Sequence, residues 1–165
     1  MQKGGNAMVT VINEYLHKEL ITVNLEAESP EDIFYAMAEM LKNNGYVKDS
    51  FYNGLVERES KFPTGLLLGK YNVAIPHTDA IHVLKPTIAI ATLKHPVKFN
   101  CMDGSGDVNV EIVFLLALNE PHSQIVMLQQ LMLLIQDEDI LRNMHFAKDS
   151  GELYDIVSKF KFEYK

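Results

Sequence analysis

The organisation of the chain follows from one stretch of sequence, Asn72-Val73-Ala74-Ile75-Pro76-His77-Thr78-Asp79. Val73 to Ile75 predict a short strand, because branched side chains suit a pleated and buried surface. Pro76 ends that strand, since proline has no N–H to donate to a neighbouring strand. His77 is therefore expected at a strand end, where a rigid sheet holds a side chain that solvent reaches. It is the candidate reactive group.

Three elements are predicted before this stretch. Residues Glu19 to Leu25 alternate with a period of two and indicate a strand. An amphipathic covering helix is expected to begin at Ser29-Pro30, which supply an N-cap and a first helical position, and to end at Asn43-Asn44-Gly45. A second helix is expected from about Lys48 to just before Pro63, with Arg58 in its last turns.

Strands and helices also alternate after this stretch. Thr87 to Leu93 predicts a strand and Lys94 to Asn109 a loop. Val110 to Leu118 is nearly all apolar, which is typical of a strand covered on both faces. Three helices are expected to follow, over residues 125–135, 137–144 and 150–160. Strands interleaved with helices predict an α/β sandwich.

A second histidine, His122, stands in the same kind of position as His77. The strand that ends near Leu118 is followed by Pro121 and His122, directly before the helix expected from Ile125. His122 or Ser123 is thus expected at the amino end of a helix, where free backbone N–H groups favour negative charge. Two histidines are therefore predicted at strand ends.

Composition limits what these histidines do. At 165 residues and 47% hydrophobic composition, the chain predicts one domain over residues 9–165, with residues 1–8 either disordered or an extension. A single cysteine, Cys101, excludes an internal disulfide and fits a reducing compartment. No apolar run reaches the ~18–20 residues of a membrane span. A cytoplasmic protein is therefore expected. The net charge of −7 argues against nucleic acid as a partner.

Two other catalytic signatures are incomplete. Gly65 to Lys70 imitates a phosphate-binding loop, but the spacing is one residue short and Tyr71 replaces the hydroxyl that holds magnesium. Gly104-Ser105-Gly106 is not the Gly-x-Ser-x-Gly elbow of a serine nucleophile. Neither nucleotide binding nor serine hydrolysis is favoured.

A metal site stays open as an alternative. Its ligands would be His77, Asp79, His82 and His122. Zinc binds such residue types, but this spacing is not the helical i, i+4 pair of a metalloprotease. A His/Asp metal hydrolase is the alternative that this set implies.

A histidine is also a nucleophile in its own right and forms covalent phosphoryl intermediates. Imidazole has a reference pKa of about 6.5, so much of it is unprotonated near neutral pH. The phosphoryl group is negatively charged and favours a helix start, a second imidazole or an arginine as its neighbours. His122 and Arg58 are residues of these types.

Four short stretches together resemble one known family. They are Arg58-Glu59, Pro63-Thr64-Gly65, Ala74-Ile75-Pro76-His77, and His122 ahead of a leucine-rich helix. From about Leu20 to its end the chain resembles the IIA components of the bacterial phosphoenolpyruvate-dependent sugar phosphotransferase system, in the mannitol/fructose class. The stretches around Phe62–Leu66 and Pro76–Asp79 look most like the galactitol-type branch, although the interval from Arg58 to His77 is a few residues longer than in mannitol-type members.

The resemblance implies a fold and a reaction. The fold is a three-layer sandwich, a mixed sheet with helices on both faces, without a cofactor. The reaction is that of a phosphotransferase: His77 accepts a phosphoryl group from HPr and passes it to a cysteine of a IIB component. The membrane IIC component takes part indirectly, in the uptake of a sugar or hexitol such as galactitol. His122 orients or stabilises the phosphoryl group, and Arg58 is the nearby cation.

One further alternative belongs to a different class. The domain is then a regulatory module that binds another protein according to its phosphorylation state and passes no phosphoryl group to a transporter. No DNA-binding or antiterminator segment is recognised within these 165 residues, so this alternative is expected less than the carrier.

Overall fold

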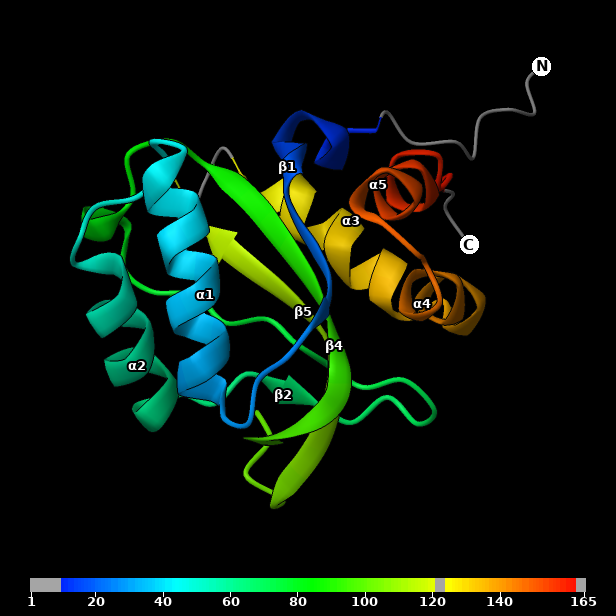
Figure 1. Ribbon diagram of the computed structural model, residues 1–165, viewed down its shortest axis with the longest axis horizontal. Coiled ribbons are helices and arrows are strands. Elements are labelled where there is room, and N and C mark those ends of the chain that lie inside the picture. Colours follow the sequence, from blue (N-terminus) through cyan, green and yellow to red (C-terminus); the bar gives the residue numbers. More distant parts are fainter. Residues whose placement is uncertain (1–9, 121–123, 163–165) are drawn as a thin grey trace.

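A mixed β-sheet forms the middle layer of the molecule (Figure 1). The computed structural model describes residues 10–120 and 124–162, and within these the sheet has five strands in the order β1-β4-β5-β3-β2. Their bounds are β1 Leu16–Leu25, β2 Gly65–Leu66, β3 Val73–Ala74, β4 Thr87–Asn100 and β5 Asp107–Ala117. The β1/β4 and β3/β5 pairs are parallel, whereas the β4/β5 and β2/β3 pairs are antiparallel. The extension expected at residues 1–8 lies outside the described residues.

Helices cover both faces of this sheet (Figure 1). Helices α1 (Pro30–Asn43) and α2 (Phe51–Lys61) pack on one face, and α3 (Ile125–Ile135), α4 (Glu138–His145) and α5 (Ser150–Ser158) pack on the other. The predicted three-layer α/β sandwich is confirmed. None of the helices described in the structure combines the length and apolar character that a membrane span requires.

Alternating side chains along the central strands divide the core in two. On β4, the small Ala89 and Ala91 point toward α1 and α2, while the larger Ile88 and Ile90 point toward α3, α4 and α5. All four are fully buried. Strand β5 alternates in the same way, so the prediction that it is covered on both faces is confirmed.

The first helix begins and ends as its sequence predicts. The Ser29 hydroxyl accepts a hydrogen bond from the backbone N–H of Asp32 at 3.2 Å, and Pro30 occupies the first helical position. Gly45 has φ +83°, the left-handed conformation that glycine adopts readily after a helix end. These caps fix where the chain turns toward α2.

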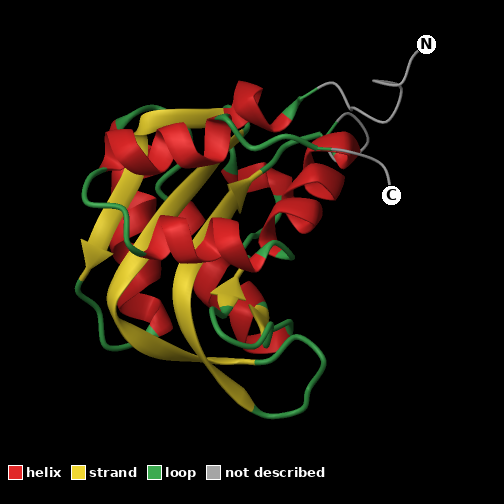
Figure 2. Cartoon of the chain, turned by 90° about the vertical axis from the view of Figure 1, so that its right-hand side faces the viewer, coloured by secondary structure: helices red, strands yellow, loops and turns green. Residues whose placement is uncertain are grey.

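The prediction of a loop over Lys94 to Asn109 is wrong. Strand β4 continues to Asn100, β5 begins at Asp107, and the two pair as a hairpin that extends beyond the helices (Figure 2). Pro96 is accommodated because the pairing shifts register between Thr92 and Val97, so its missing N–H breaks no regular ladder. The turn predicted at Asp103 to Asp107 does connect the two strands.

Candidate active site

His77 lies where the chain leaves β3, as predicted from Pro76. The backbone N–H of Leu116 in β5 donates to the Pro76 carbonyl at 3.0 Å, and His77 pairs with Leu116 in a single parallel bridge. The sheet therefore holds the backbone on both sides of this histidine. Its side chain is half-buried, so a rigid backbone presents a ring that solvent still reaches.

One hydrogen bond decides the form of the His77 ring. Nδ1 lies 3.0 Å from the carbonyl oxygen of Ile75, two residues earlier. Because a carbonyl oxygen only accepts hydrogen bonds, Nδ1 must carry the proton and donate it. In the neutral ring the lone pair is then on Nε2. The site thus contains an imidazole with a defined nucleophilic nitrogen.

Arg58 reaches the loop that follows His77. It extends from the last turns of α2, and its Nη1 lies 3.6 Å from Oδ1 of Asp79, two residues after the histidine. Its guanidinium carbon lies 4.6 Å from the centre of the Phe62 ring. Its Nε is buried and has no hydrogen-bond partner among the described residues. The long interval of sequence between Arg58 and His77 does not keep the arginine away from this loop.

The loop after His77 rests against α2. A Cβ atom on Gly54 would lie 2.8 Å from Oγ1 of Thr78 and 2.9 Å from Nε2 of His82, so only glycine allows this approach. The loop is also held by hydrogen bonds: Nδ1 of His82 lies 2.7 Å from the hydroxyl of Ser50, and the His82 carbonyl accepts from Lys48 N–H at 2.9 Å. Sequence reasoning missed these contacts, although a glycine inside a predicted helix was a signal for close packing.

Glu59, adjacent to Arg58, makes the other polar contact near the site. Its carboxyl accepts two hydrogen bonds from Thr64, one from the backbone N–H at 2.9 Å and one from the hydroxyl at 2.8 Å. Burial raises the pKa of this carboxyl, and the hydrogen bonds from Thr64 partly oppose that shift. The sequence motif Arg58-Glu59 is thus a pair of residues with separate partners.

His122 lies outside the described residues, so its predicted place in the site stays a prediction. The described ends of the neighbouring elements agree with it. Strands β3 and β5 are parallel neighbours, and their carboxyl ends, Ala74 and Ala117, therefore lie at the same edge of the sheet. The chain that leads to His122 leaves β5 at the edge where His77 leaves β3.

The described residues give the metal alternative no support. Within residues 10–120 and 124–162 no group of three histidine, cysteine, aspartate or glutamate side chains is arranged to hold an ion. Asp79 is paired with Arg58, and His82 with Ser50. Cys101 is buried and pairs with Gly65 in a single bridge, as a small core residue does.

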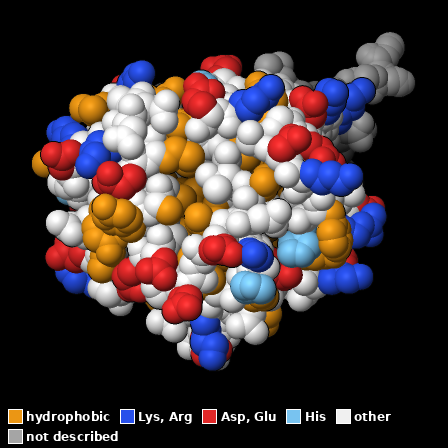
Figure 3. All heavy atoms as spheres, viewed as in Figure 1, with side chains coloured by type: hydrophobic (Ala, Val, Ile, Leu, Met, Phe, Trp, Pro, Cys, Tyr) orange, Lys and Arg blue, Asp and Glu red, His pale blue; other side chains and the backbone are white. Residues whose placement is uncertain are grey.

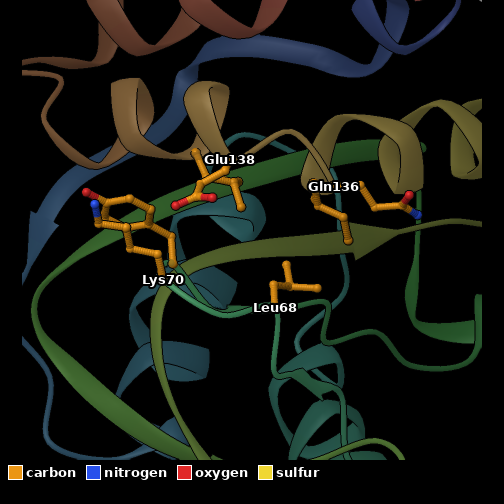
Figure 4. Close-up of a pocket in the computed structure, with 7 residues that line it drawn as sticks. Leu68, Lys70, Gln136 and Glu138 are labelled. Carbon is orange, nitrogen blue, oxygen red and sulfur yellow. The ribbon is translucent and has the colours of Figure 1, made fainter.

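His77 is not among the residues that line a pocket of about 180 Å³ (Figure 4). Leu68, Lys70, Gln136 and Glu138 are among the residues that line it, together with Tyr71, which comes before β3, whereas His77 follows that strand. None of its lining residues is a histidine, cysteine or serine. The pocket therefore contributes no imidazole, thiol or serine hydroxyl that could take part in the chemistry of the His77 ring.

Comparison with known proteins identifies the family. Residues 14–160 match the family model described as "Phosphoenolpyruvate-dependent sugar phosphotransferase system, EIIA 2". The chain belongs to this family. Its IIA components are phosphotransferases that act through a phosphohistidine, and the resemblance seen in the sequence is confirmed.

The relatives include a galactitol component. The galactitol-specific EIIA component of Escherichia coli K12 is 35% identical over 100 residues, which cover 61% of this chain and 67% of that protein. Among solved structures, the solution structure of the mannitol-specific cryptic enzyme IIA of Escherichia coli has a TM-score of 0.74 at 21% identity, covering 90% of this chain and 99% of that one. A complex of the mannitol IIA enzyme with phosphorylated IIB from Escherichia coli has a TM-score of 0.71 at 21% identity, covering 88% of this chain and 98% of that one. The structural likenesses support the fold.

Proposed function

We propose that this IIA component carries its phosphoryl group on Nε2 of His77, accepting it from phospho-HPr and passing it to a cysteine of a IIB component. The observation that supports this most directly is the 3.0 Å hydrogen bond from Nδ1 to the Ile75 carbonyl, which leaves the lone pair on Nε2. The strand end and the half-buried ring supply a fixed nucleophile that a partner protein approaches from solvent.

Both transfers use the same nitrogen. In the first, the Nε2 lone pair forms a bond to phosphorus while the bond from phosphorus to its donor atom on HPr breaks, and the donor atom keeps that electron pair. In the second, a thiolate of the IIB component attacks phosphorus, and the bond to Nε2 breaks and returns the lone pair to His77. The Nδ1 proton stays hydrogen-bonded to Ile75 through both steps.

Arg58 and His122 are proposed to stabilise the bound phosphoryl group. A guanidinium forms strong charge-assisted hydrogen bonds to phosphoryl oxygens, and the buried Nε of Arg58 still has a donor to offer. Its contact with Asp79 is partly exposed, so a phosphoryl group on His77 displaces that carboxylate at low cost. His122 is proposed to orient or stabilise the phosphoryl group, from the chain that leaves β5.

The features around the site suit protein partners. Phe62 and Ile81, which flank the Arg58 and His82 contacts, are 57% and 69% exposed. On the face drawn in Figure 3, acidic and basic side chains are interspersed. The net charge of −7 therefore favours a basic partner through the field of the molecule rather than through one patch on that face. A carrier that works between HPr and IIB acts in the cytoplasm and delivers phosphoryl groups indirectly to IIC.

The galactitol-specific relative, together with the stretches around Phe62–Leu66 and Pro76–Asp79, supports a galactitol-type hexitol as the sugar of the system. The carrier meets HPr and IIB rather than the sugar. This part of the proposal is therefore tested with IIB components of different specificity. Transfer from this chain to a galactitol-type IIB that exceeds transfer to mannitol-type and fructose-type IIB supports it, and a reversed preference refutes it.

Three histidine variants test the acceptor. After incubation with phosphoenolpyruvate, enzyme I and HPr, His77→Ala is expected to gain no phosphoryl mass, and His122→Ala to gain it more slowly. His95→Ala, an exposed histidine in the β4–β5 hairpin, is the control and is expected to match the wild type. Phosphorylation that persists in His77→Ala overturns the proposal. A wild-type protein that is phosphorylated but transfers to no IIB component points instead to the regulatory alternative.

A further inference from the structure

A partly buried carboxyl contact lies one residue from Arg58 and does not touch the proposed reacting atoms. Both carboxyl oxygens of Glu59, at the end of α2, accept hydrogen bonds from Thr64: Oε2 from the backbone N–H and Oε1 from the hydroxyl. Thr64 is 1% exposed, so its backbone N–H and hydroxyl could not bond to water if the Glu59 carboxyl were lost. The contact closes the short connection between α2 and β2.

From Thr64 the hydrogen bonds lead to the ring of His77. The carbonyl of Thr64 accepts from the backbone N–H of Ile75 at 3.2 Å, and the carbonyl of Ile75 accepts from Nδ1 of His77 at 3.0 Å. Strands β2 and β3 pair over only two residues each, Gly65 with Ala74 and Leu66 with Val73. Strand β5 holds the other side of β3, so on the β2 side the support of the Ile75 peptide comes from Thr64 and this short ladder.

The same contact sets the surroundings of Arg58. Phe62, whose ring stacks on the Arg58 guanidinium, lies in the connection that Glu59 and Thr64 close. Its backbone N–H donates to the Arg58 carbonyl at 2.8 Å. A shift of Thr64 therefore moves both sides of the site, the histidine ring through Ile75 and the guanidinium through Phe62.

We infer that Glu59 is a positioning residue for phosphoryl transfer: by holding Thr64 it fixes the Ile75 carbonyl, and thereby the tautomer and orientation of the His77 ring. The inference rests on the proposed function of His77 for its effect on transfer, but its effect on the ring is independent of any phosphoryl donor. A role confined to the stability of the α2–β2 connection makes a different prediction, because it leaves the tautomer of the His77 ring in the folded protein unchanged.

The test compares Glu59→Ala and Glu59→Gln with Glu57→Ala, a matched control on the same helix. Glu57 is exposed and only approaches Lys61, at 4.0 Å. Two quantities are measured on the folded protein: the tautomer populations of His77, from its ring ¹⁵N chemical shifts, and the initial rate of phosphorylation by phospho-HPr. The thermal midpoint is recorded for each variant, so that rates are corrected to the folded fraction.

Glu59→Ala is expected to shift His77 away from the Nδ1–H tautomer and to slow phosphorylation by roughly tenfold, because small displacements of a reacting group are costly. Glu59→Gln is expected to recover part of the Nδ1–H tautomer population and part of the phosphorylation rate, since its amide oxygen still accepts from Thr64 N–H. If Glu59→Ala fails to fold, Thr64→Val removes the hydroxyl contact alone and is expected to show the same two changes more weakly.

An unchanged His77 tautomer in the folded variants refutes the inference, and so does a rate loss that only follows the unfolded fraction. A wild-type protein that accepts no phosphoryl group refutes the proposed function instead. In that case the ring ¹⁵N shifts still report whether Glu59 governs the tautomer, so the two failures are distinguishable.

Discussion

Replacing Gly54 by alanine separates the geometry of the site from the stability of the fold. In α2 the substitution gains about 1 kcal/mol of helix propensity. The added Cβ, however, lies 2.8 Å from Oγ1 of Thr78 and 2.9 Å from the ring of His82, whereas ordinary contacts begin at 3.4 Å. The side chains of Thr78 and His82 must therefore shift by about 0.5–0.6 Å, and overpacking of this kind costs about 1–3 kcal/mol.

The two effects on stability have opposite signs, so the free energy of unfolding is expected to change by less than about 2 kcal/mol. The effect on transfer has no such compensation. Thr78, one of the two displaced residues, directly follows His77, and a misplacement near 1 Å costs up to ~100-fold in rate. We expect the initial rate of phosphoryl acceptance from phospho-HPr to fall roughly tenfold, measured by intact mass after rapid quenching.

Gly151→Ala is the matched control for Gly54→Ala. Gly151 also lies in a helix, α5, but a Cβ there meets Asp149 Oδ1 at an ordinary 3.4 Å. This variant is expected to gain about 0.5–1 kcal/mol of stability and to keep the wild-type rate. If Gly54→Ala accepts phosphoryl groups at the wild-type rate, or if its rate loss is fully explained by unfolded protein, then the contact of Gly54 with Thr78 and His82 does not position His77.

Three further substitutions follow from individual contacts. Asp79→Asn removes the partly exposed carboxylate that competes for Arg58, so phosphoryl acceptance is expected to rise by up to about fivefold at low salt and less at high salt; a slower rate contradicts the displacement of Asp79. Gly65→Ala places a Cβ 2.7 Å from the backbone oxygen of Asn100, which has no freedom to rotate away, and is expected to lose about 1–3 kcal/mol in urea denaturation; wild-type stability would refute this close approach. Because burial raises the pKa of Glu59, its protonated form favours folding: this contribution is fully present below the ordinary pKa of 4.5 and is lost as pH rises through the folded value. The thermal midpoint of the wild type should therefore fall relative to that of Glu59→Gln as pH rises from about 4 to 7, and a difference that stays constant or grows contradicts the burial effect.

Much of the fold is predictable because helix caps and strand alternation are set by residues that are close together in the sequence. Ser29 and Pro30 start α1 where the N-cap types stand, and the alternating Ile88, Ala89, Ile90 and Ala91 indicate a strand with unequal faces. The β4–β5 hairpin was missed because Pro96 among polar residues is typical of a loop. The alternation of buried Val97 and Phe99 with exposed Lys98 was the signal for a continued strand.

In the candidate site, too, some features are predictable from local sequence and others depend on how distant segments pack. His77 is predictable because a proline directly after a strand is a local signal for a strand end. The contacts of Glu59 with Thr64 and of Gly54 with the loop after His77 depend on how α2 closes onto the sheet, which no local pattern contains. Arg58 was found by its residue type, but its pairing with Asp79 follows only from the packing of that loop.

NMR spectroscopy of the phosphorylated protein tests most directly whether Nε2 of His77 is the phosphoryl acceptor. Protein labelled with ¹⁵N at histidine is phosphorylated with phosphoenolpyruvate, enzyme I and HPr, and the coupling between phosphorus and nitrogen identifies the bonded atom. We expect one acid-labile phosphoryl group, coupled to Nε2 of His77, with Nδ1 still protonated. A phosphoryl group on Nδ1 or on another residue, or no phosphorylation by partners shown to be active, would contradict it.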